Sequence, residues 1–408
     1  MKNVKTFAAS LALGATLSTG AWASELVINS DASDPAPKQA WEEIVKRFEA
    51  EYPDINVKYN LYDHEAYKTT IRNWLVTSPP DVVFWYAGNR MKTFVDRGLF
   101  EDVSDIWKDQ GMDETFKSAQ PAMTVNGKQY GVPYTYYQWG IYYRKDIFDK
   151  FGIAEPKTWD ELLKASETLK ANDVTPFTIG TKYLWTAAGW FDYLNMRTNG
   201  LDFHIELMDG KVPYTDERVK KTFANWAQLV EKDYFLDSHA SYSWQEAQPF
   251  LYNGQAAMYL MGNFITPNFP EDIKDNMGFF QFPVIDPAVP LAEDAPMDTL
   301  HIPSKAENKE DARKFLEFVA RAENQALINE MMLQIPTNNE ASVKDDPFLN
   351  KGVAMLNSAA GTAQFYDRDT DPAMAKEGMK GFQQFMVHPD RIDKILEKLE
   401  KTRQRTFK

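Results

Sequence analysis

The chain is 408 residues long, 44% hydrophobic and 25% charged, a composition typical of a soluble globular protein with two or three domains. Its 45 basic and 59 acidic residues give a net charge of −14, which argues against a nucleic-acid partner or an anionic membrane surface, because both need a basic footprint. Cysteine is absent, which excludes disulfides, thiol catalysis, Cys-ligated zinc, iron–sulfur clusters and lipidation on Cys.

The first 23 residues have the pattern of a secretory signal peptide. Lys2 and Lys5 form a positively charged start, residues 7–17 are mostly apolar, and an Ala-Trp-Ala sequence ending at Ala23 supplies the small residues of a cleavage site. The apolar stretch is shorter than the ~20 residues that span a bilayer, so a membrane anchor is the weaker alternative. We therefore expect the mature protein to be exported and free in the periplasm.

The segment after residue 23 alternates strand-like and helix-like patterns. Residues 26–28 and 82–84 are short apolar runs typical of buried strands, and residues 55–61 alternate apolar and polar side chains, as in a half-buried strand. Between the first two strands, apolar residues from Trp41 to Phe48 recur at the spacing of one helix face. Strand, helix and strand in this order predict a parallel sheet with crossover helices.

Further along the chain, Asn126-Gly127 predicts a tight hairpin turn. Apolar stripes at 312–319 and 392–399 predict two more amphipathic helices. There is no Gly/Ser-rich linker, so two lobes would have to be joined by structured crossings rather than by a flexible tether.

Enzyme motifs are absent from the sequence. It contains no G-x-S-x-G, G-x-G-x-x-G, P-loop or H-E-x-x-H motif, and its five His are not spaced to share a metal on one helix. Residues 367–371 mimic the start of a calcium loop, but Pro372 stands where Gly is required and Gly378 where a bidentate Glu belongs. We therefore predict a polar loop there, and no enzyme activity, metal or cofactor.

Aromatic residues beside polar ones indicate a binding site. Trp85 and Tyr86 directly follow the apolar run 82–84, with Asn89 and Arg90 just behind. In an open parallel sheet, ligands bind beyond the carboxyl ends of the strands, where these residues would lie. Flat rings that stack on a pyranose, together with side chains that hydrogen bond to its hydroxyls, are typical of a sugar site.

Three further segments are rich in aromatic side chains: residues 134–139, residues 185–190 and Trp244. The alternative for any one of these rings is a place in the core, because aromatic residues dominate core burial. Trp41 and Trp226 lie on helical stripes, so we assign them to the core. Trp185 and Trp190 border Gly or Thr rather than an apolar run, which favours a cleft.

Short motifs follow one another along the whole chain after residue 23. They are F-E-A-E-Y-P-D-I at 48–55, P-D-V-V-F-W at 80–85, Y-G-V-P at 130–133, Y-Y-R-K-D-I-F at 142–148, K-T-W-D-E-L at 157–162, F-L-Y-N-G-Q-A-A-M at 250–258, G-N-F at 262–264, F-P at 282–283, I-P at 302–303 and I-P-T at 335–337. In number and order they make the chain resemble the extracellular solute-binding proteins of ABC-type sugar importers, in particular the branch that includes the maltodextrin-binding proteins.

The resemblance implies an α/β, two-lobed periplasmic-binding-protein fold of type II, with each lobe a mostly parallel sheet flanked by helices. Residues 24–136 and 301–337 would form the N-terminal lobe, and residues 137–300 and 338–408 the C-terminal lobe, joined by hinge crossings. The resemblance also implies a monomer that captures a sugar or oligosaccharide between the lobes. The closed form would deliver it to a membrane permease, which would recognise exposed acidic or polar surface on both lobes.

Some site residues are implied by position in the family pattern. Asp31 occupies the place of a sugar-binding acid, and Trp85 that of a stacking Trp. Asn89 and Arg90 resemble the family's Asp-Arg pair, with Asn in place of Asp. One extra residue separates this pair from the stacking Trp in the present sequence.

Other positions depart from the maltodextrin-binding pattern. Tyr137 stands where those proteins have a hydroxyl-binding Glu, and Phe264 where they have a stacking Trp, so maltodextrin itself is not the expected ligand. Asp298 lies at a lobe crossing, and Arg368 would project from the C-terminal lobe, where it could suit a sugar acid. The expected ligand-binding residues are Asp31, His64, Trp85, Tyr86, Asn89, Arg90, Tyr137, Gln138, Trp185, Trp190, Trp244, Asn263, Phe264, Asp298 and Arg368.

Two other classes of protein remain open at this point. A secreted glycoside hydrolase or lyase would also stack sugars on Trp, but it would turn its ligand over. A periplasmic binder of a polyamine would suit the negative net charge and would show salt-dependent affinity. A ferric-ion binder needs clustered Tyr with His or carboxylates, and Tyr136-Tyr137 alone is not such a cluster.

Overall fold

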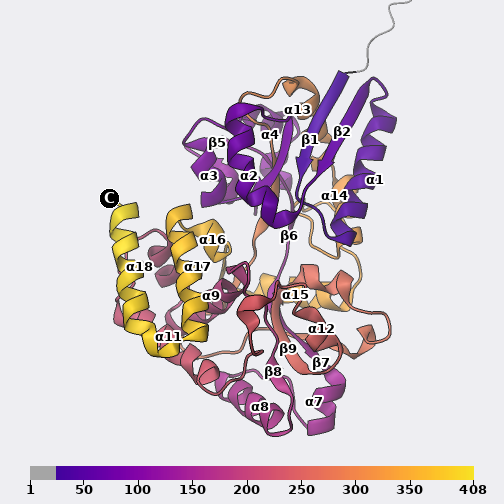
Figure 1. Cartoon of the computed structure of the whole chain (residues 1–408). Helices are drawn as coiled ribbons and strands as arrows, with labels where there is room; N and C mark the ends of the chain where they lie inside the picture. Colours follow the sequence, from indigo (N-terminus) through magenta and orange to yellow (C-terminus); the bar gives the residue numbers. More distant parts are fainter. Residues whose placement is uncertain (1–23) are drawn as a thin grey trace, which may run out of the picture.

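The computed structural model describes residues 24–408, and the expected signal peptide, residues 1–23, lies outside this range. The described chain forms two lobes stacked one above the other, with helices α17 (Pro372–Val387) and α18 (Ile392–Thr406) along one side of the lower lobe (Figure 1). One β-sheet lies at the centre of each lobe. No helix in residues 24–408 is long and apolar enough to cross a membrane.

The upper lobe is built on a five-stranded sheet with the order β2-β1-β3-β12-β6. Its strands are β1 (Ser24–Ser30), β2 (Ile55–Leu61), β3 (Val82–Tyr86), β6 (Val132–Tyr136) and β12 (Met297–His301). β1 pairs in parallel with β2 and β3, whereas β12 pairs antiparallel with β3 and β6. The three predicted N-terminal strands are confirmed, but only half of the pairings in this sheet are parallel.

Helices cover the upper sheet where the apolar stripes predict them. The helices and small strands of this lobe are α1 (Pro35–Glu51), α2 (His64–Thr77), α3 (Asn89–Val95), α4 (Ser104–Asp109), α5 (Met112–Thr115), α6 (Gln120–Met123), β4 (Thr124–Val125), β5 (Lys128–Gln129), α13 (Lys309–Ala320) and α14 (Ala322–Met332). On α1, Trp41, Ile44 and Phe48 are fully buried. The hairpin at Asn126-Gly127 is also confirmed, since both residues have the positive φ (52° and 76°) that such a turn requires.

The chain returns to the upper lobe late in the sequence. α13 and α14, orange in Figure 1, pack beside the indigo N-terminal elements. β12 belongs wholly to the upper sheet, so the expected boundary between residues 300 and 301 falls inside a strand. The return to the upper lobe begins at Met297, because β12 pairs with β3 and β6 from its first residues onward.

The lower lobe is built on a four-stranded sheet with the order β10-β7-β9-β8. Its strands are β7 (Trp139–Arg144), β8 (Thr175–Phe177), β9 (Ala256–Gly262) and β10 (Met277–Phe280). Only β8 and β9 are parallel, so the prediction of a mostly parallel sheet is wrong here. The reason is that β7 begins at Trp139 and runs away from the upper lobe, whereas β9 runs back towards it and ends at Gly262, which pairs with Trp139. The two strands therefore run in opposite directions.

The other elements of the lower lobe surround this sheet. They are α7 (Lys145–Phe151), α8 (Trp159–Ala171), α9 (Trp185–Asn199), α10 (Leu201–Met208), α11 (Glu217–Val230), η1 (His239–Ser241), α12 (Gln248–Tyr252), η2 (Asn263–Asn268), η3 (Lys274–Asn276), β11 (Ala292–Asp294), α15 (Pro347–Ser358), β13 (Gly361–Ala363), α16 (Tyr366–Asp369), α17 (Pro372–Val387), η4 (Pro389–Arg391) and α18 (Ile392–Thr406). β11 and β13 form a small parallel pair, and the predicted C-terminal helix is confirmed as α18.

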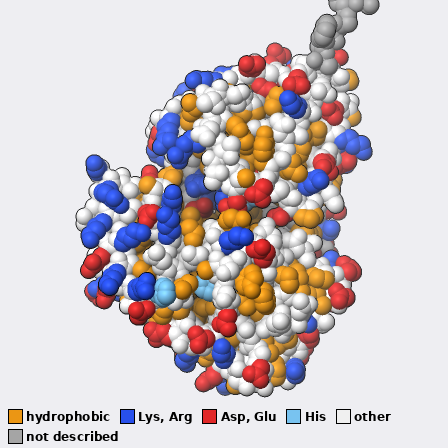
Figure 2. Space-filling view, in the orientation of Figure 1, with side chains coloured by type: hydrophobic (Ala, Val, Ile, Leu, Met, Phe, Trp, Pro, Cys, Tyr) orange, Lys and Arg blue, Asp and Glu red, His pale blue; other side chains and the backbone are white. Residues whose placement is uncertain are grey.

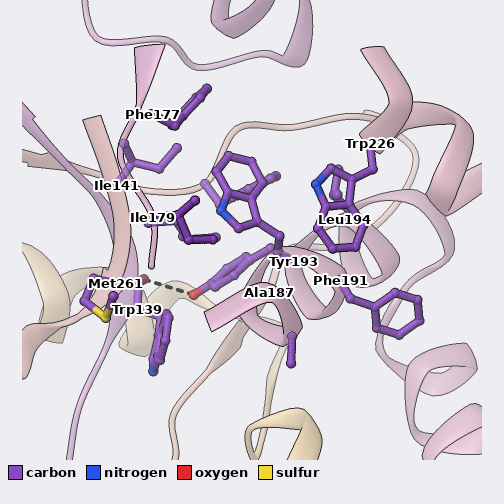
Figure 3. Packing of buried hydrophobic residues seen from close by; sticks show 14 of the residues in the cluster. Trp139, Ile141, Phe177, Ile179, Ala187, Phe191, Tyr193, Leu194, Trp226 and Met261 are labelled. Carbon is purple, nitrogen blue, oxygen red and sulfur yellow. Dashed lines mark hydrogen bonds between the residues drawn. The ribbon is translucent and has the colours of Figure 1, made fainter. Parts of the chain in front are cut away.

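The core of the lower lobe is rich in aromatic rings that pack around α9 (Figure 3). The Tyr193 hydroxyl donates a hydrogen bond of 2.9 Å to the carbonyl of Trp139, which ties α9 to the first strand of the sheet (Figure 3). Trp190 lies in this core with 1% of its surface exposed, 4.9 Å from the Phe177 ring. The prediction that Trp190 lies in the cleft is therefore wrong. Every residue of α9 from 186 to 198 is buried, so the Gly and Thr residues near Trp190 lie in the core with it.

The lobes are joined by structured crossings. Tyr137 and Gln138 connect β6 to β7, residues 295–296 connect β11 to β12, and the segment after Met332 connects α14 to α15. The first and third crossings lie side by side, because Tyr136 and Ile335 exchange backbone hydrogen bonds of 2.9 and 3.1 Å. The absence of a flexible linker in the sequence agrees with this arrangement.

Candidate functional site

A cavity of about 140 Å³ lies between the lobes and is lined by side chains from both of them. Ten of the fifteen predicted site residues line it: Asp31, His64, Trp85, Tyr86, Tyr137, Trp185, Trp244, Phe264, Asp298 and Arg368. These residues come from strand ends, helix starts and crossings that are far apart in the sequence.

The upper wall of the cavity carries hydrogen-bonding side chains. Asp31 follows β1 directly, and its Oδ2 lies 2.9 Å from Nδ1 of His64 at the start of α2. The Asp63 side chain accepts a 2.9 Å hydrogen bond from the backbone N–H of Ala66 and so caps α2, which fixes where His64 points. The Tyr86 hydroxyl lies 3.4 Å from Nε2 of His64.

Arg368 reaches from the lower lobe to a carboxylate of the upper sheet. Its Nη1 donates to Oδ1 of Asp298 at 3.0 Å and to the carbonyl of Met297 at 3.1 Å. Its Nη2 donates to the Tyr137 hydroxyl at 2.8 Å, and its guanidinium lies 4.0 Å from the centre of the Tyr86 ring. Burial raises the pKa of Asp298 to about 6, against the opposing effect of Arg368.

The lower wall is made mostly of aromatic rings. Trp185, at the start of α9, lies 6.0 Å from Trp139 and 6.3 Å from Trp244, edge to face in both cases. Phe264 lies 5.2 Å from Trp244, and Phe365 stacks on Trp139 at 4.7 Å. Edge-to-face packing turns neighbouring rings in different directions, so the wall offers both faces and edges to a ligand.

Two predicted residues lie outside the cavity and connect the lobes instead. The side-chain amide of Asn89, at the start of α3, donates to the carbonyl of Asp369 in α16. Arg90, from the next position, lies 3.9 Å from Asp367, and its guanidinium lies 5.1 Å from the Trp85 ring centre. Both residues therefore bridge α3 of the upper lobe and α16 of the lower lobe.

The remaining predicted residues are buried in the structure away from the cavity. Gln138 is fully buried and donates to the carbonyl of Phe348 at 3.1 Å. Asn263 is also fully buried, accepts from the Tyr142 hydroxyl at 2.7 Å and donates to the carbonyl of Leu333. Both expectations of a cleft position are corrected, as for Trp190, because these polar side chains satisfy backbone groups near the crossings.

Several lining residues were not predicted from the sequence. Asp34 lies three residues after Asp31 and accepts a 3.4 Å hydrogen bond from Gln245 of the lower lobe. Burial raises the pKa of Asp34, although this hydrogen bond lowers it in part. Trp139 belongs to the aromatic segment 134–139, and its indole N–H has no hydrogen-bond partner among the described residues. Phe365 has no local pattern that marks it, since it reaches the cavity only through the packing of α16.

The calcium-like string at 367–371 does not form a metal loop. Asp367 to Asp369 lie in the short helix α16, and Asp371 caps α17. Among residues 24–408, no group of three or more His, Asp or Glu is placed to hold a metal ion. The expected polar loop is therefore a helix, and its residues Asp367 and Arg368 line the cavity.

Comparison with known proteins places the chain in a family. The model of the bacterial extracellular solute-binding protein family matches residues 32–326. An uncharacterised ABC transporter extracellular-binding protein of Pyrococcus horikoshii is 30% identical over 79% of this chain and 74% of its own length. A multiple sugar-binding protein of Streptococcus mutans is 27% identical over 68% of this chain and 67% of its own.

A solved structure gives the same result for the fold. The bacterial solute receptor AcbH, described as having an exclusive substrate preference for β-D-galactopyranose, is 29% identical and superimposes with a TM-score of 0.89. The superposition covers 95% of this chain and all of the receptor. The two-lobed fold, the cavity between the lobes and the family match lead to one conclusion: the chain belongs to the bacterial extracellular solute-binding proteins.

Proposed function

We propose that the cavity between the lobes holds one small sugar and that the lobes close on it. The chain is the carbohydrate-binding component of an ABC importer, as its family and its sugar-binding relatives indicate. None of these relatives is named as a glycoside hydrolase, a lyase or a polyamine binder, so the two alternatives from the sequence gain no support from them.

The observation that carries this proposal is the pairing of two unlike walls. Rings of Trp185, Trp244 and Phe264 line the same cavity as the carboxylates of Asp31 and Asp298. The C–H faces of a pyranose pack on aromatic rings, while its hydroxyls donate to carboxylates. A cavity of about 140 Å³ is smaller than the ~300 Å³ at which drug-sized ligand clefts begin, so a single ring suits it better than a long chain.

Ligand capture would act on the balance between open and closed lobes. A sugar that touches both walls binds the closed arrangement better than the open one and so shifts the population towards it. The contacts of Asn89 and Arg90 with α16 join the two lobes through protein groups alone. The ligand then has to supply only part of the closing free energy.

The family indicates a place outside the cytoplasmic membrane. We propose the periplasm as that place, with the mature chain beginning near residue 24. The mature chain would act as a monomer and pass its ligand to membrane-embedded permease subunits. We also propose that it binds without turnover, as a delivery protein must.

Isothermal titration calorimetry tests the sugar site directly. The mature chain is titrated with mono-, di- and trisaccharides, and native mass spectrometry of the freshly purified protein identifies any co-purified ligand. We expect heat with at least one sugar and recovery of that sugar unchanged. If no sugar in the panel gives heat and none co-purifies, the proposal is wrong.

A further inference from the structure

We propose that the cavity selects uncharged sugars over sugars that carry a carboxylate, and that Asp298 sets this preference by neutralising Arg368. This inference rests on the proposed sugar-binding function and names the chemical class of the ligand. It also revises the expectation that Arg368 suits a sugar acid, which follows from its position in the sequence but not from its contacts.

Protein groups already accept three hydrogen bonds from the guanidinium of Arg368. Recognition of a carboxylate by Arg uses two parallel N–H donors that point at its two oxygens. Here Nη1 donates to Asp298 and to the carbonyl of Met297, while Nη2 donates to the Tyr137 hydroxyl. One face of the guanidinium is covered by Tyr86 at 4.0 Å. A ligand carboxylate would therefore compete with Asp298 for a cation whose charge is already neutralised.

The other basic side chains of the cavity, His64 and Lys68, are paired in the same way. Nδ1 of His64 lies 2.9 Å from the Asp31 carboxylate, and Nζ of Lys68 lies 2.9 Å from Glu65. Among the described lining residues, therefore, each basic side chain has a carboxylate of the protein beside it. Figure 2 shows acidic and basic side chains next to one another along the waist between the lobes.

The remaining charges make the cavity unfavourable for an anion. Asp34 and Asp367 also line it: Asp367 lies 3.9 Å from Arg90, and the basic group near Asp34 is His64, which already pairs with Asp31. A ligand carboxylate brought into this enclosed space would lose its hydration and meet like charges without a free cation, which raises the free energy of the complex. A neutral sugar meets no such penalty, because its hydroxyls can donate to the carboxylates already present.

Matched pairs of sugars that differ only at C6 test this preference. We would titrate the mature chain with D-galactose and D-galacturonate, and with D-glucose and D-glucuronate, at pH 7.5 and fixed ionic strength. If only an oligosaccharide binds, the partner is the same oligosaccharide ending in a uronic acid. We expect the neutral sugar to bind at least about 100-fold more tightly than its uronate, since like charges across an interface cost several kcal/mol. Equal or tighter binding of the uronate overturns the inference, whereas no binding of any sugar overturns the proposed function instead.

Asp298→Asn then tests which residue sets the preference. The amide keeps the shape of the side chain and removes the charge that neutralises Arg368. The affinity for the neutral sugar divided by the affinity for its uronate should therefore fall at least about tenfold. Asp102→Asn is the matched control, because it removes the same charge from an exposed ion pair with Lys128 at 2.6 Å, remote from the cavity. If Asp298→Asn folds and keeps the wild-type ratio of these two affinities, Asp298 does not set the preference for neutral sugars. The wild-type comparison decides the preference itself even if this variant does not fold.

Discussion

The two walls of the cavity differ in how they are built. The upper wall carries most of the charged side chains, and these come from strand ends and from the first turns of helices, as with Asp31 after β1 and His64 at the start of α2. The lower wall carries most of the rings, and these come from segments that meet only through packing, as with Trp185, Trp244 and Phe365. Asp367 and Arg368 are the exceptions, charged side chains of the lower lobe, and Arg368 reaches the upper sheet.

This difference suggests a division of roles between the lobes. Charged groups need rigid supports, since a misplaced buried charge costs several kcal/mol, and strand ends and capped helices supply such supports. Aromatic rings tolerate small shifts because their contact with a sugar is spread over many atoms. We therefore expect changes on the upper wall to alter which ligand binds, and changes on the lower wall to alter how tightly it binds.

The largest expected effect comes from breaking the ion pair between Arg368 and Asp298, which joins the walls. Arg368→Met leaves the Asp298 carboxylate, whose side chain is only 19% exposed, without its cation, which should lower the free energy of unfolding by about 3 kcal/mol. The double variant with Asp298→Asn should regain at least half of that loss, because the unpaired charge is gone. Urea unfolding of the three proteins, followed by circular dichroism, measures both values.

An exposed pair of the same type serves as the control. Arg313 binds Asp105 at 2.7 Å on the surface of the upper lobe, so Arg313→Met should cost no more than about 1 kcal/mol. If Arg368→Met costs as little as Arg313→Met, the pair between the walls does not stabilise the folded protein.

The pH dependence of stability should separate the two lobes. Burial raises the pKa of Asp369 in the lower lobe to about 8, and that of Asp298 in the upper sheet to about 6. Both groups bind a proton more tightly in the folded than in the unfolded chain, so each contributes stability at low pH that is lost as pH rises to its folded pKa. Between pH 6 and 8 Asp369 should contribute a loss of up to about 1.4 kcal/mol per pH unit.

Isosteric amides identify the groups responsible. Asp369→Asn should flatten the fall in the free energy of unfolding between pH 6 and 8, because the amide does not titrate. Asp298→Asn should change the profile only below about pH 6. The charged and titratable groups that face Asp369 are Asp209 of the α10 end, Asp192 of α9, Asp294 of β11 and Arg368 of α16. An unchanged slope in Asp369→Asn would assign the alkaline loss to Asp192 or Asp294, whose pKa values burial also raises.

A change confined to the rings should affect affinity alone. Trp185→Ala removes a half-buried ring from the lower wall and should weaken binding of the cognate sugar by about 2 kcal/mol, or about 30-fold. Tyr183→Ala is the matched control, since Tyr183 is an exposed ring two residues away with 42% of its surface accessible. Calorimetry should show the control within about twofold of wild type, and equal losses in both variants would mean that Trp185 does not contact the ligand.

The upper lobe could be predicted from the sequence in considerable detail. Its strands and the stripe from Trp41 to Phe48 are local patterns with periods of 2 and 3.6 residues, and Asp31 and Trp85 lie where a parallel sheet ends. The family resemblance added Tyr137, Asp298 and other positions that local patterns do not mark.

The errors concern contacts between residues far apart in the chain. Gln138 and Asn263 are polar and lie near aromatic residues, yet they hydrogen bond to the carbonyls of Phe348 and Leu333, which no local pattern indicates. Trp190 was expected in the cleft because of its small neighbours, but α9 is buried on all sides. The antiparallel pairing of β7 with β9 depends on the direction in which residues 137–138 carry the chain from the upper lobe into the lower one, and that direction depends on how both lobes are arranged.

The smallest expected effect compares two helix caps, one in each lobe. Asp63→Ala removes the cap of α2, which carries His64 and Lys68 into the cavity, and Thr158→Ala removes the cap of α8, which lies away from it. Each should lower the free energy of unfolding by about 1 kcal/mol. Only Asp63→Ala should also weaken sugar binding, by about threefold, because it loosens the support of a charged group on the upper wall. Equal affinities in the two variants would show that the start of α2 need not be rigid, and the proposed division of roles between the walls would then be wrong at that helix.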